Sequence, residues 1–317
     1  MTTLRRLGAT DLHIAPLVLG GNVFGWNLDK AGSFAVLDAF VAGGGTMIDT
    51  ADVYSAWAPG HKGGESETVI GEWLKASGKR DQVLIATKVG MLPGANGEKL
   101  APAHIAASAE ASLKRLGIDR IDLYFAHQDD EGVPQEDVLA AFGKLIDAGK
   151  IRALGASNFR AARLKSANDA ARVHGLPHYH ALQPEYNLVS RHKFEGELQD
   201  YCVEHNIGVV PFYGLANGFL TGKYRSPADY GKSAVRGTRM AAYMEGKGPL
   251  VLAALDKIAA ETGASPAQIS LAWLAAQPGV TAPIASATSI AQVEELLGSI
   301  DLTLTPDQLS TLDAAGA

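Results

Sequence analysis

The chain lacks the features that mark several large classes of protein. A single cysteine, Cys202, stands among 317 residues, so no internal disulfide can form and a reducing compartment is expected. The net charge is −6 and no stretch is rich in Lys or Arg, which argues against a nucleic-acid partner. No uninterrupted apolar run approaches the length of a membrane span, and the N-terminal residues lack the apolar region of a signal peptide. We therefore expect a cytoplasmic protein that binds neither nucleic acid nor membrane.

Motifs for metal ions, nucleophilic catalysis and a Rossmann turn are missing as well. His174, His178 and His180 form a local cluster, but no Cys or acidic ligand is spaced with them, so we expect a surface loop and no metal site. The Gly-rich segment 20–25 has Asn22 where a dinucleotide fingerprint needs its second glycine. The chain contains neither a His-Glu-x-x-His motif nor a nucleophile elbow.

The pattern that is present alternates between strands and helices. Apolar residues make up 47% of the chain, enough for a large core. Eight short apolar runs are separated by segments whose apolar residues recur at helical spacing. This alternation predicts an α/β fold whose parallel sheet closes into a (β/α)8 TIM barrel, with a doubly wound sheet as the alternative. No Pro/Gly/Ser linker divides the chain, so we expect one domain over residues 1–317. The predicted strands are Ile14–Leu19, Thr46–Asp49, Val83–Lys88, Ile121–His127, Ala153–Ser157, Ala181–Pro184, Ile207–Tyr213 and Thr281–Ala285.

Two helix starts near the C-terminus carry a strong local signal. Ser265 and Thr305 are each followed by Pro at the next position and by Gln three positions on. This order is typical of an N-cap, a Pro in the first turn and a capping-box partner. It predicts that helices begin directly after both residues.

The segment from Asn217 to Gly248 departs from the alternation. It has no clear periodicity, contains six glycines and is basic within an acidic protein, through Lys223, Arg225, Lys232, Arg236 and Arg239. In compact domains, segments of this length are usually lids, binding loops or disordered. Two interpretations stay open: a solvated loop, and a long flap that closes over a phosphate-bearing cofactor.

Four polar residues stand at or near the ends of successive predicted strands. Asp49, Lys88 and His127 each close an apolar run, and Tyr54 follows five residues after Asp49. The carboxyl ends of barrel strands open onto one face, where the active site lies. A carboxylate, a phenol, an ammonium and an imidazole are therefore expected to meet at one mouth.

This set of side chains suits proton transfer to a carbonyl oxygen. A phenol gives up its proton reluctantly at neutral pH, and a neighbouring ammonium favours the phenolate, so we expect Lys88 to lower the pKa of Tyr54. Asp49 would pair with Lys88, and His127 would donate a hydrogen bond to the carbonyl oxygen or orient the substrate. Together they would protonate a developing alkoxide, and in reverse Tyr54 would take the proton of an alcohol.

Four motifs carry a resemblance to a known family. The run from Ile48 to Tyr54 resembles an Asp-Thr-Ala-x-x-Tyr signature, Ala86–Val89 a lysine strand, Asp122–His127 a histidine strand, and Gly155–Phe159 a nicotinamide-binding turn. The family is the aldo-keto reductases, and the resemblance runs from about Leu4 to about Leu309. It implies a barrel without a Rossmann domain, NAD(P)(H) as cofactor, hydride transfer between nicotinamide and a carbonyl, and Asp49, Tyr54, Lys88 and His127 as the catalytic set.

The resemblance also assigns the cofactor contacts. Ser157, Asn158 and Gln183 match positions that hold the nicotinamide carboxamide, and Phe212 matches the aromatic that stacks on its ring. Leu215, Asn217 and Gly218 match the loop around the pyrophosphate, and Tyr213, Gly214 and Lys223 are further expected cofactor contacts. At the adenosine end they are Ser286, Thr288, Ser289, Gln292 and Glu295, where a helix starting there would offer its N-terminus to the 2′-phosphate or ribose.

Two departures from the family pattern bear on the choice of cofactor. The eighth strand commonly ends in Ile-Pro-Gly, and here it reads Ile284-Ala285-Ser286. Many NADP(H)-preferring relatives carry Lys or Arg within the stretch that matches 286–292, and this chain has neither there. Hydroxyl groups bind a phosphate less strongly than a charged fork does. NADP(H) is the expected cofactor, with NAD(H) as the alternative.

Substrate preference is predicted from residues expected to ring the mouth: Trp26, Trp57, Met91 and Tyr213. Aromatic walls favour flat or bulky apolar substrates. The leading interpretation is an NAD(P)(H)-dependent oxidoreductase that interconverts aldehydes or ketones and alcohols. An alcohol or sugar dehydrogenase working mainly in oxidation and a cofactor-sensing regulatory subunit are the alternatives. The chain is expected to be a monomer or a small homo-oligomer.

Overall fold

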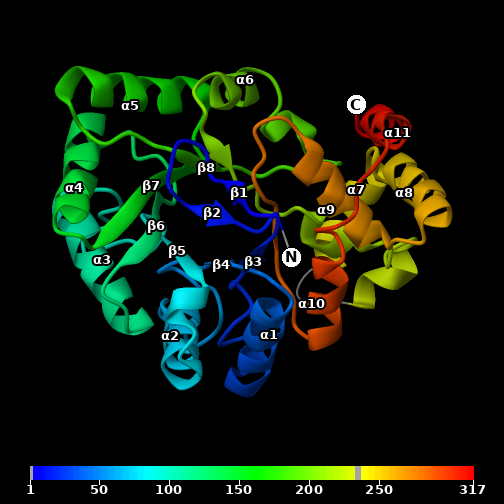
Figure 1. Cartoon of the computed structure of the whole chain (residues 1–317), viewed down its shortest axis with the longest axis horizontal. Helices are drawn as coiled ribbons and strands as arrows, with labels where there is room; N and C mark the ends of the chain where they lie inside the picture. The colour runs from blue at the N-terminus through cyan, green and yellow to red at the C-terminus, as the bar shows by residue number, and fades with distance from the viewer. Residues whose placement is uncertain (1–2, 233–236) are drawn as a thin grey trace.

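The computed structural model describes residues 3–232 and 237–317 and contains a sheet of eight parallel strands. The strands follow the order β10-β3-β4-β5-β6-β7-β8-β9. The chain after α9 also hydrogen-bonds to the far edge, because Thr281 N donates to Val209 O at 2.8 Å and Ile284 N to Pro211 O at 2.9 Å. The sheet is thereby curled into a barrel, which confirms the predicted fold (Figure 1). The strands are β3 (Val18–Gly20), β4 (Met47–Asp49), β5 (Leu84–Val89), β6 (Ile121–Ala126), β7 (Ile151–Ser157), β8 (Ala181–Gln183), β9 (Gly208–Val209) and β10 (Ile284–Ala285).

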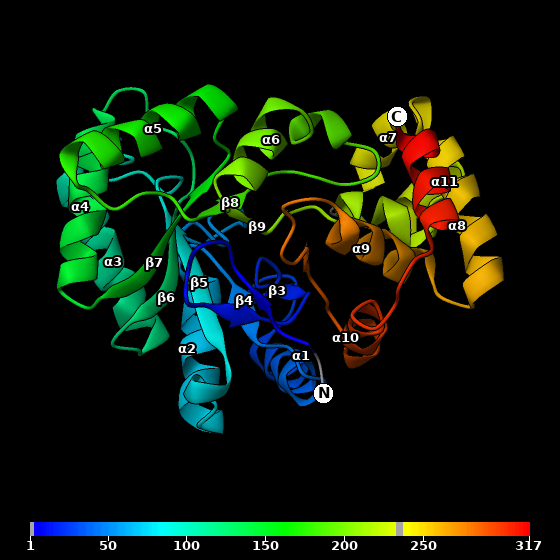
Figure 2. The same cartoon turned by 45° about the horizontal axis from the view of Figure 1, so that its top comes forward.

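Helices surround this sheet on its outer side, as Figure 2 shows. On the half of the ring around β3 to β8 they are α1 (Lys30–Ala42), α2 (Glu65–Ser77), α3 (Pro102–Leu116), α4 (Gln135–Asp147), α5 (Ala161–His174) and α6 (Glu197–Glu204). The remaining helices are α7 (Met240–Glu245), α8 (Gly248–Thr262), α9 (Pro266–Ala276), α10 (Ile290–Leu297) and α11 (Pro306–Gly316). Short 3-10 turns are η1 (Arg80–Gln82), η2 (Arg191–Lys193), η3 (Ala216–Thr221), η4 (Pro227–Lys232) and η5 (Gly237–Arg239).

The strands are mostly apolar on both faces, because both faces are buried. Along β6, Leu123 and Phe125 belong to the apolar cluster inside the barrel. Tyr124 and Ala126 alternate with them and pack in the cluster between sheet and helices. This two-residue period with both faces buried is what makes parallel strands read as continuous apolar runs.

The first predicted strand, Ile14–Leu19, is wrong as a single element. His13–Ile14 forms β2, which pairs antiparallel with β1 (Arg5–Arg6), and the barrel strand starts only at Val18. Pro16 lies between them and has no N–H to donate to a ladder. The hairpin covers the amino-terminal end of the barrel, where a Cβ added at Gly8 would lie 2.4 Å from Gly208 N. Gly8 has φ +52°, so glycine is needed there on both counts.

Both predicted helix starts are confirmed. Ser265 and Thr305 cap α9 and α11, and each forms a complete capping box with the Gln three residues on. The segment predicted to be aperiodic contains η3, η4, η5 and α7, so its described residues form a series of short helical turns. Of its basic residues, Arg236 lies outside the described part of the chain.

The histidine cluster lies at the expected surface loop, between α5 and β8, where His174 and His178 are exposed. His174 ends α5, and His180 is half-buried just before β8, with its ring centroid 4.1 Å from that of His178. Residues 3–232 and 237–317 contain no group of three or more side chains placed to hold a metal ion.

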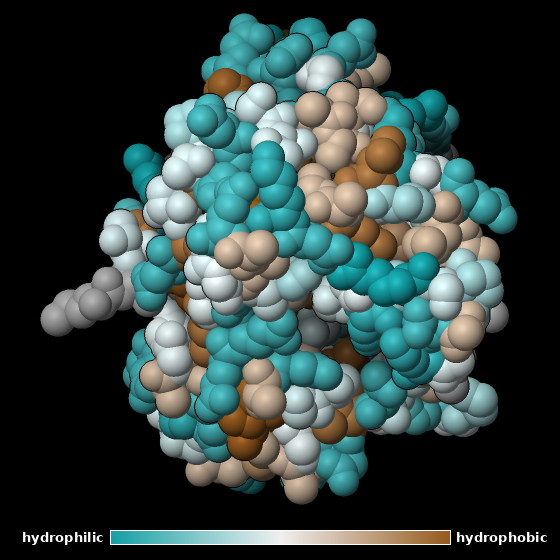
Figure 3. Space-filling view, turned by 90° about the vertical axis from the view of Figure 1, so that its right-hand side faces the viewer, coloured by the Kyte–Doolittle hydropathy of each residue, from teal (hydrophilic) through white to brown (hydrophobic). Residues whose placement is uncertain are grey.

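The outer surface is mostly polar where it can be seen in Figure 3. On that face, on the side of α8 and α11, hydrophobic residues form small, separate patches among hydrophilic ones. Within the described part of the chain, no helix is long and apolar enough to cross a membrane.

Candidate active site

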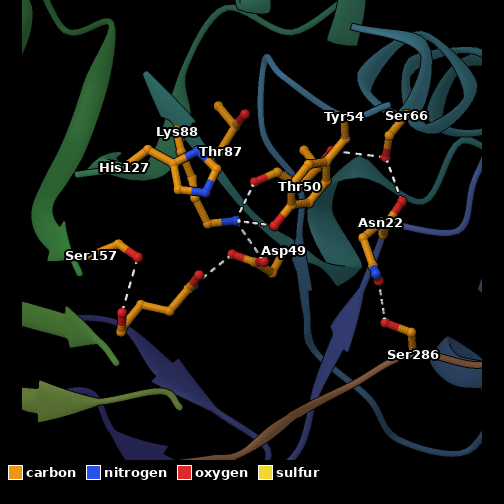
Figure 4. Close-up of polar contacts among 12 residues, drawn as sticks. Asn22, Asp49, Thr50, Tyr54, Ser66, Thr87, Lys88, His127, Ser157 and Ser286 are labelled. Atoms are coloured by element: carbon orange, nitrogen blue, oxygen red, sulfur yellow. Dashed lines mark hydrogen bonds and ion pairs between the residues drawn. The ribbon is translucent and has the colours of Figure 1, made fainter. Parts of the chain in front are cut away.

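Three of the four expected catalytic side chains are joined by direct contacts at the carboxyl ends of the strands (Figure 4). Lys88 Nζ donates to Asp49 Oδ2 at 2.7 Å, to the Thr50 carbonyl at 2.6 Å and to Tyr54 Oη at 3.2 Å. The Tyr54 and His127 ring centroids lie 6.0 Å apart. Lys88 is fully buried, so its charge acts on Tyr54 with little screening by water.

The parallel register of the sheet places these residues together. Asp49 is the last residue of β4, Lys88 lies near the end of β5, and His127 directly follows β6. The His127 N–H donates to Val89 O at 2.8 Å, which continues the β5 and β6 pairing to the mouth. Tyr54 comes from the segment between β4 and α2.

The electrostatics of the site keep its phenol protonated. Burial raises the pKa of Tyr54 above its ordinary value, and the neighbouring Lys88 only partly offsets this. The expectation that Lys88 lowers the pKa of Tyr54 is confirmed for the effect of Lys88 itself, while burial makes the net change a rise. Burial works to lower the pKa of Lys88, but Asp49 and Tyr54 outweigh it and the net pKa is raised. At neutral pH the site holds a neutral phenol beside a charged ammonium.

His127 is neutral in the same environment. Burial, with a smaller contribution from Lys88, places its pKa well below the ordinary value. Its Nδ1 is buried and has no hydrogen-bond partner among the described residues. A neutral imidazole carries one N–H, which can donate a hydrogen bond to an oxygen held near Tyr54.

A hydroxyl and two amides gather at the ends of β7 and β8. Ser157 Oγ donates to Gln183 O at 2.9 Å, and Asn158 Nδ2 donates to Ser157 Oγ at 3.1 Å and to His127 O at 2.9 Å. Gln183 Nε2 donates to Asp49 Oδ1 at 2.9 Å. The three residues expected at the nicotinamide carboxamide are thus brought together beside the proton-transfer set.

The chain after β9 holds several residues in the left-handed region. Tyr213, Ala216 and Asn217 have φ of +56°, +47° and +57°, followed by Gly218 at +90°. Such a conformation costs on the order of 1 kcal/mol for an L residue, and it clusters at ligand-binding segments. The fully buried Asn187 donates to the Tyr213 carbonyl at 3.0 Å and helps to hold this turn. Phe212 precedes it and packs edge-on against Tyr213 at 5.0 Å.

The basic residues of segment 217–248 differ in whether an ion pair already holds their side chains. Arg239 Nη1 lies 3.3 Å from Tyr213 Oη and 3.3 Å from Asn217 Oδ1, so it stands over the left-handed turn. Lys223 is close to Gly218, where an added Cβ would lie 3.7 Å from its Nζ. Arg225 makes two hydrogen bonds of 2.7 Å to Asp256 and is committed there.

The residues expected at the adenosine end surround the start of α10. Ser289 caps this helix by accepting from Gln292 N, and Thr288 N donates to Gln292 Oε1 at 2.8 Å. Ser286 Oγ contacts Asn22 Oδ1 at 2.5 Å, and Glu295 is exposed. Asn22 was not expected in the site. Its signal was visible in the sequence as the residue that breaks the Gly-rich segment after β3.

Aromatic side chains line one side of the mouth. The Trp57 ring packs edge-on against Tyr54 at 5.6 Å and against Trp26 at 5.7 Å. Trp57 is 50% exposed, and Met91 and Tyr213 are also exposed. Trp26 is fixed by its indole N–H, which donates to Asn22 O at 2.6 Å.

A family model for aldo/keto reductases matches residues 16–317 of the chain. The chain belongs to the aldo/keto reductase family. Aldo-keto reductase str7 of Strobilurus tenacellus is 34% identical, over 88% of this chain and 79% of that protein. A Schizosaccharomyces pombe protein, aldo-keto reductase yakc, whose name specifies NADP(+), is 34% identical over 82% of this chain and 75% of its own length. An Arabidopsis thaliana protein named probable voltage-gated potassium channel subunit beta is 31% identical, over 98% and 95%.

As a member of this family, the chain is an NAD(P)-dependent oxidoreductase, and the family acts on small carbonyl substrates. The donor set of the site fits such a cofactor. Ser157, Asn158 and Gln183 offer both donors and acceptors, as a carboxamide requires. The left-handed turn carries Lys223 and Arg239 beside it, and cationic side chains there match a diphosphate.

Proposed function

We propose that this aldo-keto reductase interconverts aldehydes or ketones and alcohols with Tyr54 as the general acid and base. The observation that carries the proposal is the placing of Lys88 Nζ at 3.2 Å from Tyr54 Oη and 2.7 Å from Asp49. In reduction the neutral phenol gives its proton to the carbonyl oxygen, and Lys88 stabilises the phenolate left behind. In oxidation Tyr54 accepts the alcohol proton. His127, neutral and close to Tyr54, holds the reacting oxygen by one hydrogen bond.

The residues that we propose to bind the cofactor lie around the same mouth of the barrel. The nicotinamide, when bound, supplies or accepts the hydride. Ser157, Asn158 and Gln183 would hold its carboxamide, and Phe212 would lie against its ring. The segment Tyr213, Gly214, Leu215, Asn217 and Gly218 would bind the pyrophosphate, and Ser286, Thr288, Ser289, Gln292 and Glu295 the adenosine end.

NADP(H) is our proposed cofactor, with modest discrimination against NAD(H). The name of the Schizosaccharomyces pombe relative supports NADP(H). Between Ser286 and Gln292 no Lys or Arg is present, so a phosphate there would be bound by hydroxyl and backbone groups. Lys223 and Arg239 lie beside the left-handed turn, and they would bind the pyrophosphate, which both cofactors contain.

Aromatic or bulky apolar carbonyl compounds are the proposed substrates. Trp57 packs against the Tyr54 ring and is half-exposed, so a flat substrate at the phenol would lie along its indole. Met91 and Tyr213 add exposed apolar surface at the same face. Oxidation of alcohols or sugars is the second candidate, since one set of four residues serves both directions.

A direct assay tests the proposal. The absorbance of NADPH or NADH is followed with an aromatic aldehyde, a small aliphatic aldehyde and a free sugar, and the reverse reaction with the matching alcohols. We expect turnover of the aromatic aldehyde to exceed that of the others. Tight cofactor binding without turnover on any substrate would favour a cofactor-sensing role, which the likeness to potassium channel subunits raises.

We also propose a cellular location, a domain organisation and an oligomeric state for the enzyme. Cys202 is buried, and burial raises the pKa of its thiol to about 12, so this cysteine is unreactive and compatible with a cytoplasmic location. The absence of a composition break supports a single domain over 1–317, in a monomer or small homo-oligomer. Size-exclusion chromatography with light scattering measures the oligomeric state.

A further inference from the structure

Glu65, the first residue of α2, binds the segment that follows Tyr54. Its Oε2 accepts the N–H of Ser55 at 3.1 Å and of Gly63 at 3.0 Å, and its Oε1 accepts the N–H of Lys62 at 2.8 Å. One carboxylate therefore ties both ends of the 55–63 segment to the helix. None of these contacts belongs to the proton-transfer set or to the expected cofactor site.

The start of α2 holds the peptide group next to Tyr54 from both sides. Ser55 N, on one side, donates to Glu65. Tyr54 O, on the other, accepts from Ser66 N at 3.3 Å. The backbone of the proposed general acid is thus fixed by two successive residues of one helix.

Glu65 also lies against the two segments that carry the tryptophans of the mouth. Trp57 lies in the segment that the carboxylate binds. Trp26 follows Gly25, where an added Cβ would lie 3.2 Å from Glu65 Cβ. Gly25 has φ +79°, which L side chains rarely adopt, and an added Cβ would be in tight contact with Glu65, so the turn before Trp26 packs closely on Glu65. Glu65 therefore contacts both the backbone next to the Tyr54 phenol and the segments that carry the two tryptophans.

Glu65 carries a negative charge that strengthens the hydrogen bonds it accepts. Partial burial works to raise its pKa, but the N–H groups of Lys62, Glu65 itself and Ser55 outweigh it, so the pKa lies below the ordinary value. His61 Nδ1 stands 4.0 Å from the carboxylate and 3.0 Å from Ser55 Oγ. A carboxylate that accepts several N–H bonds makes charge-assisted hydrogen bonds, which are shorter and stronger than neutral ones.

We propose that Glu65 is a positioning residue for the reaction: its carboxylate sets the distance between the Tyr54 phenol and the Trp57 indole. A bulky carbonyl compound binds along the indole and is protonated by the phenol, so both its KM and its kcat depend on that distance. A small aliphatic substrate needs only the phenol. The inference rests on the proposed roles of Tyr54 and Trp57.

The test compares Glu65→Ala and Glu65→Gln with the same-helix control Glu72→Ala. In the described part of the chain, Glu72 forms an ion pair with exposed Lys30 at 2.9 Å. In Glu65→Ala, we expect kcat to fall about tenfold for both substrates and KM to rise about fivefold for an aromatic aldehyde, as a misplaced acid and wall would give. KM for a small aliphatic aldehyde and the Kd for NADPH should stay within about twofold, and Glu65→Gln should lie between Ala and wild type, because one amide oxygen still accepts.

A double-mutant cycle separates positioning from general weakening of the fold. If Glu65 acts through Trp57, the Trp57→Ala/Glu65→Ala enzyme should have the same aromatic KM as Trp57→Ala alone. Fully additive increases in KM, or Glu65 variants that match Glu72→Ala in kcat and KM, would overturn the inference. If Glu65→Ala does not fold, Glu65→Gln is subject to the same criteria. Full turnover in Tyr54→Phe would instead overturn the proposed function, whatever the Glu65 variants show.

Discussion

Gln183, at the end of β8, donates its side-chain N–H to the Asp49 carboxylate across the mouth of the barrel, at 2.9 Å. The other oxygen of Asp49 accepts from Lys88 at 2.7 Å. One carboxylate therefore joins the residues proposed for proton transfer to those proposed for the nicotinamide carboxamide. Through this carboxylate, the proposed proton donor and the proposed nicotinamide site are held in position relative to each other.

The first prediction concerns Tyr54. Tyr54→Phe removes only the hydroxyl, and the ring can still pack against Trp57. Turnover should fall by at least about a hundredfold, the usual contribution of a positioned general acid. The Kd for NADPH, measured by fluorescence quenching, and the melting temperature should stay close to wild type. An enzyme that keeps full activity would show that another group is the acid.

The second prediction concerns Lys88, whose charge partly offsets the effect of burial on Tyr54. In Lys88→Met that offset is lost, so the pKa of Tyr54 rises further. Oxidation needs the phenolate, and its residual activity should therefore shift to higher pH. The charge of Asp49 raises the pKa of Tyr54, so Asp49→Asn should move the profile in the opposite direction, to lower pH. A pH–rate profile that does not move would show that Lys88 is structural.

Loss of Lys88 also has a stability cost that needs its own control. Among the described residues, Lys88→Met leaves the buried Asp49 side chain with Gln183 as its hydrogen-bond partner, and breaking a buried pair in this way costs about 3–5 kcal/mol. The Lys88→Met/Asp49→Asn double variant removes both charges. It should melt higher than Lys88→Met alone. Its pH–rate profile should still move to higher pH but by less than that of Lys88→Met, because the charge of Asp49 also raises the pKa of Tyr54.

Much of the candidate site could be predicted because its side chains stand at strand ends. Asp49, Lys88 and His127 each terminate an apolar run, and a parallel barrel brings such ends to one face. Tyr54 needed the spacing of a family motif, since nothing in the local pattern places a residue of a connecting segment. The capping residues of α9 and α11 could be predicted equally well, because their interactions span only three residues.

What could not be predicted depends on contacts between distant parts of the chain. The Thr50 carbonyl that binds Lys88 is a backbone group with no side-chain signature. The pairing of Gln183 with Asp49 spans 134 residues. The strand β1 is only two residues long and shows no periodicity. The net direction of the Tyr54 pKa depended on burial, which the sequence does not report.

The third prediction concerns cofactor choice. Lys223→Ala and Arg239→Ala should each weaken NADPH and NADH by a similar factor, about tenfold, because their proposed partner is the shared pyrophosphate. Arg225→Ala is the matched control, since that residue is paired with Asp256 and should change neither Kd by more than about twofold. A preference of wild type for NADPH beyond about a thousandfold would mean that a charged phosphate clamp lies elsewhere.

The fourth prediction concerns Asp52, whose two carboxyl oxygens are buried without a hydrogen-bond partner among the described residues. Burial, with a contribution from Glu67, places its pKa well above the ordinary value. The unfolded chain loses this proton near pH 4 while the folded chain keeps it, so wild type loses stability as pH rises from about 4 toward the folded pKa. Asp52→Asn lacks this loss. Its melting temperature should gain on wild type by several degrees between pH 4 and pH 8, and a constant difference across that range would contradict a protonated Asp52.

The last prediction concerns substrate choice. Trp57 contacts both Trp26 and Tyr54, so its ring does more than pack at the rim of the mouth. Trp57→Ala removes the half-exposed wall beside the phenol and should raise KM for an aromatic aldehyde about tenfold, the effect of losing an aromatic contact and its buried area. KM for a small aliphatic aldehyde should change by less than about twofold, because such a substrate does not reach the indole. Trp57→Phe is the control and should recover most of the aromatic preference. Equal effects on both substrates, or a steady preference of wild type for free sugars, would show that the aromatic wall does not select the substrate.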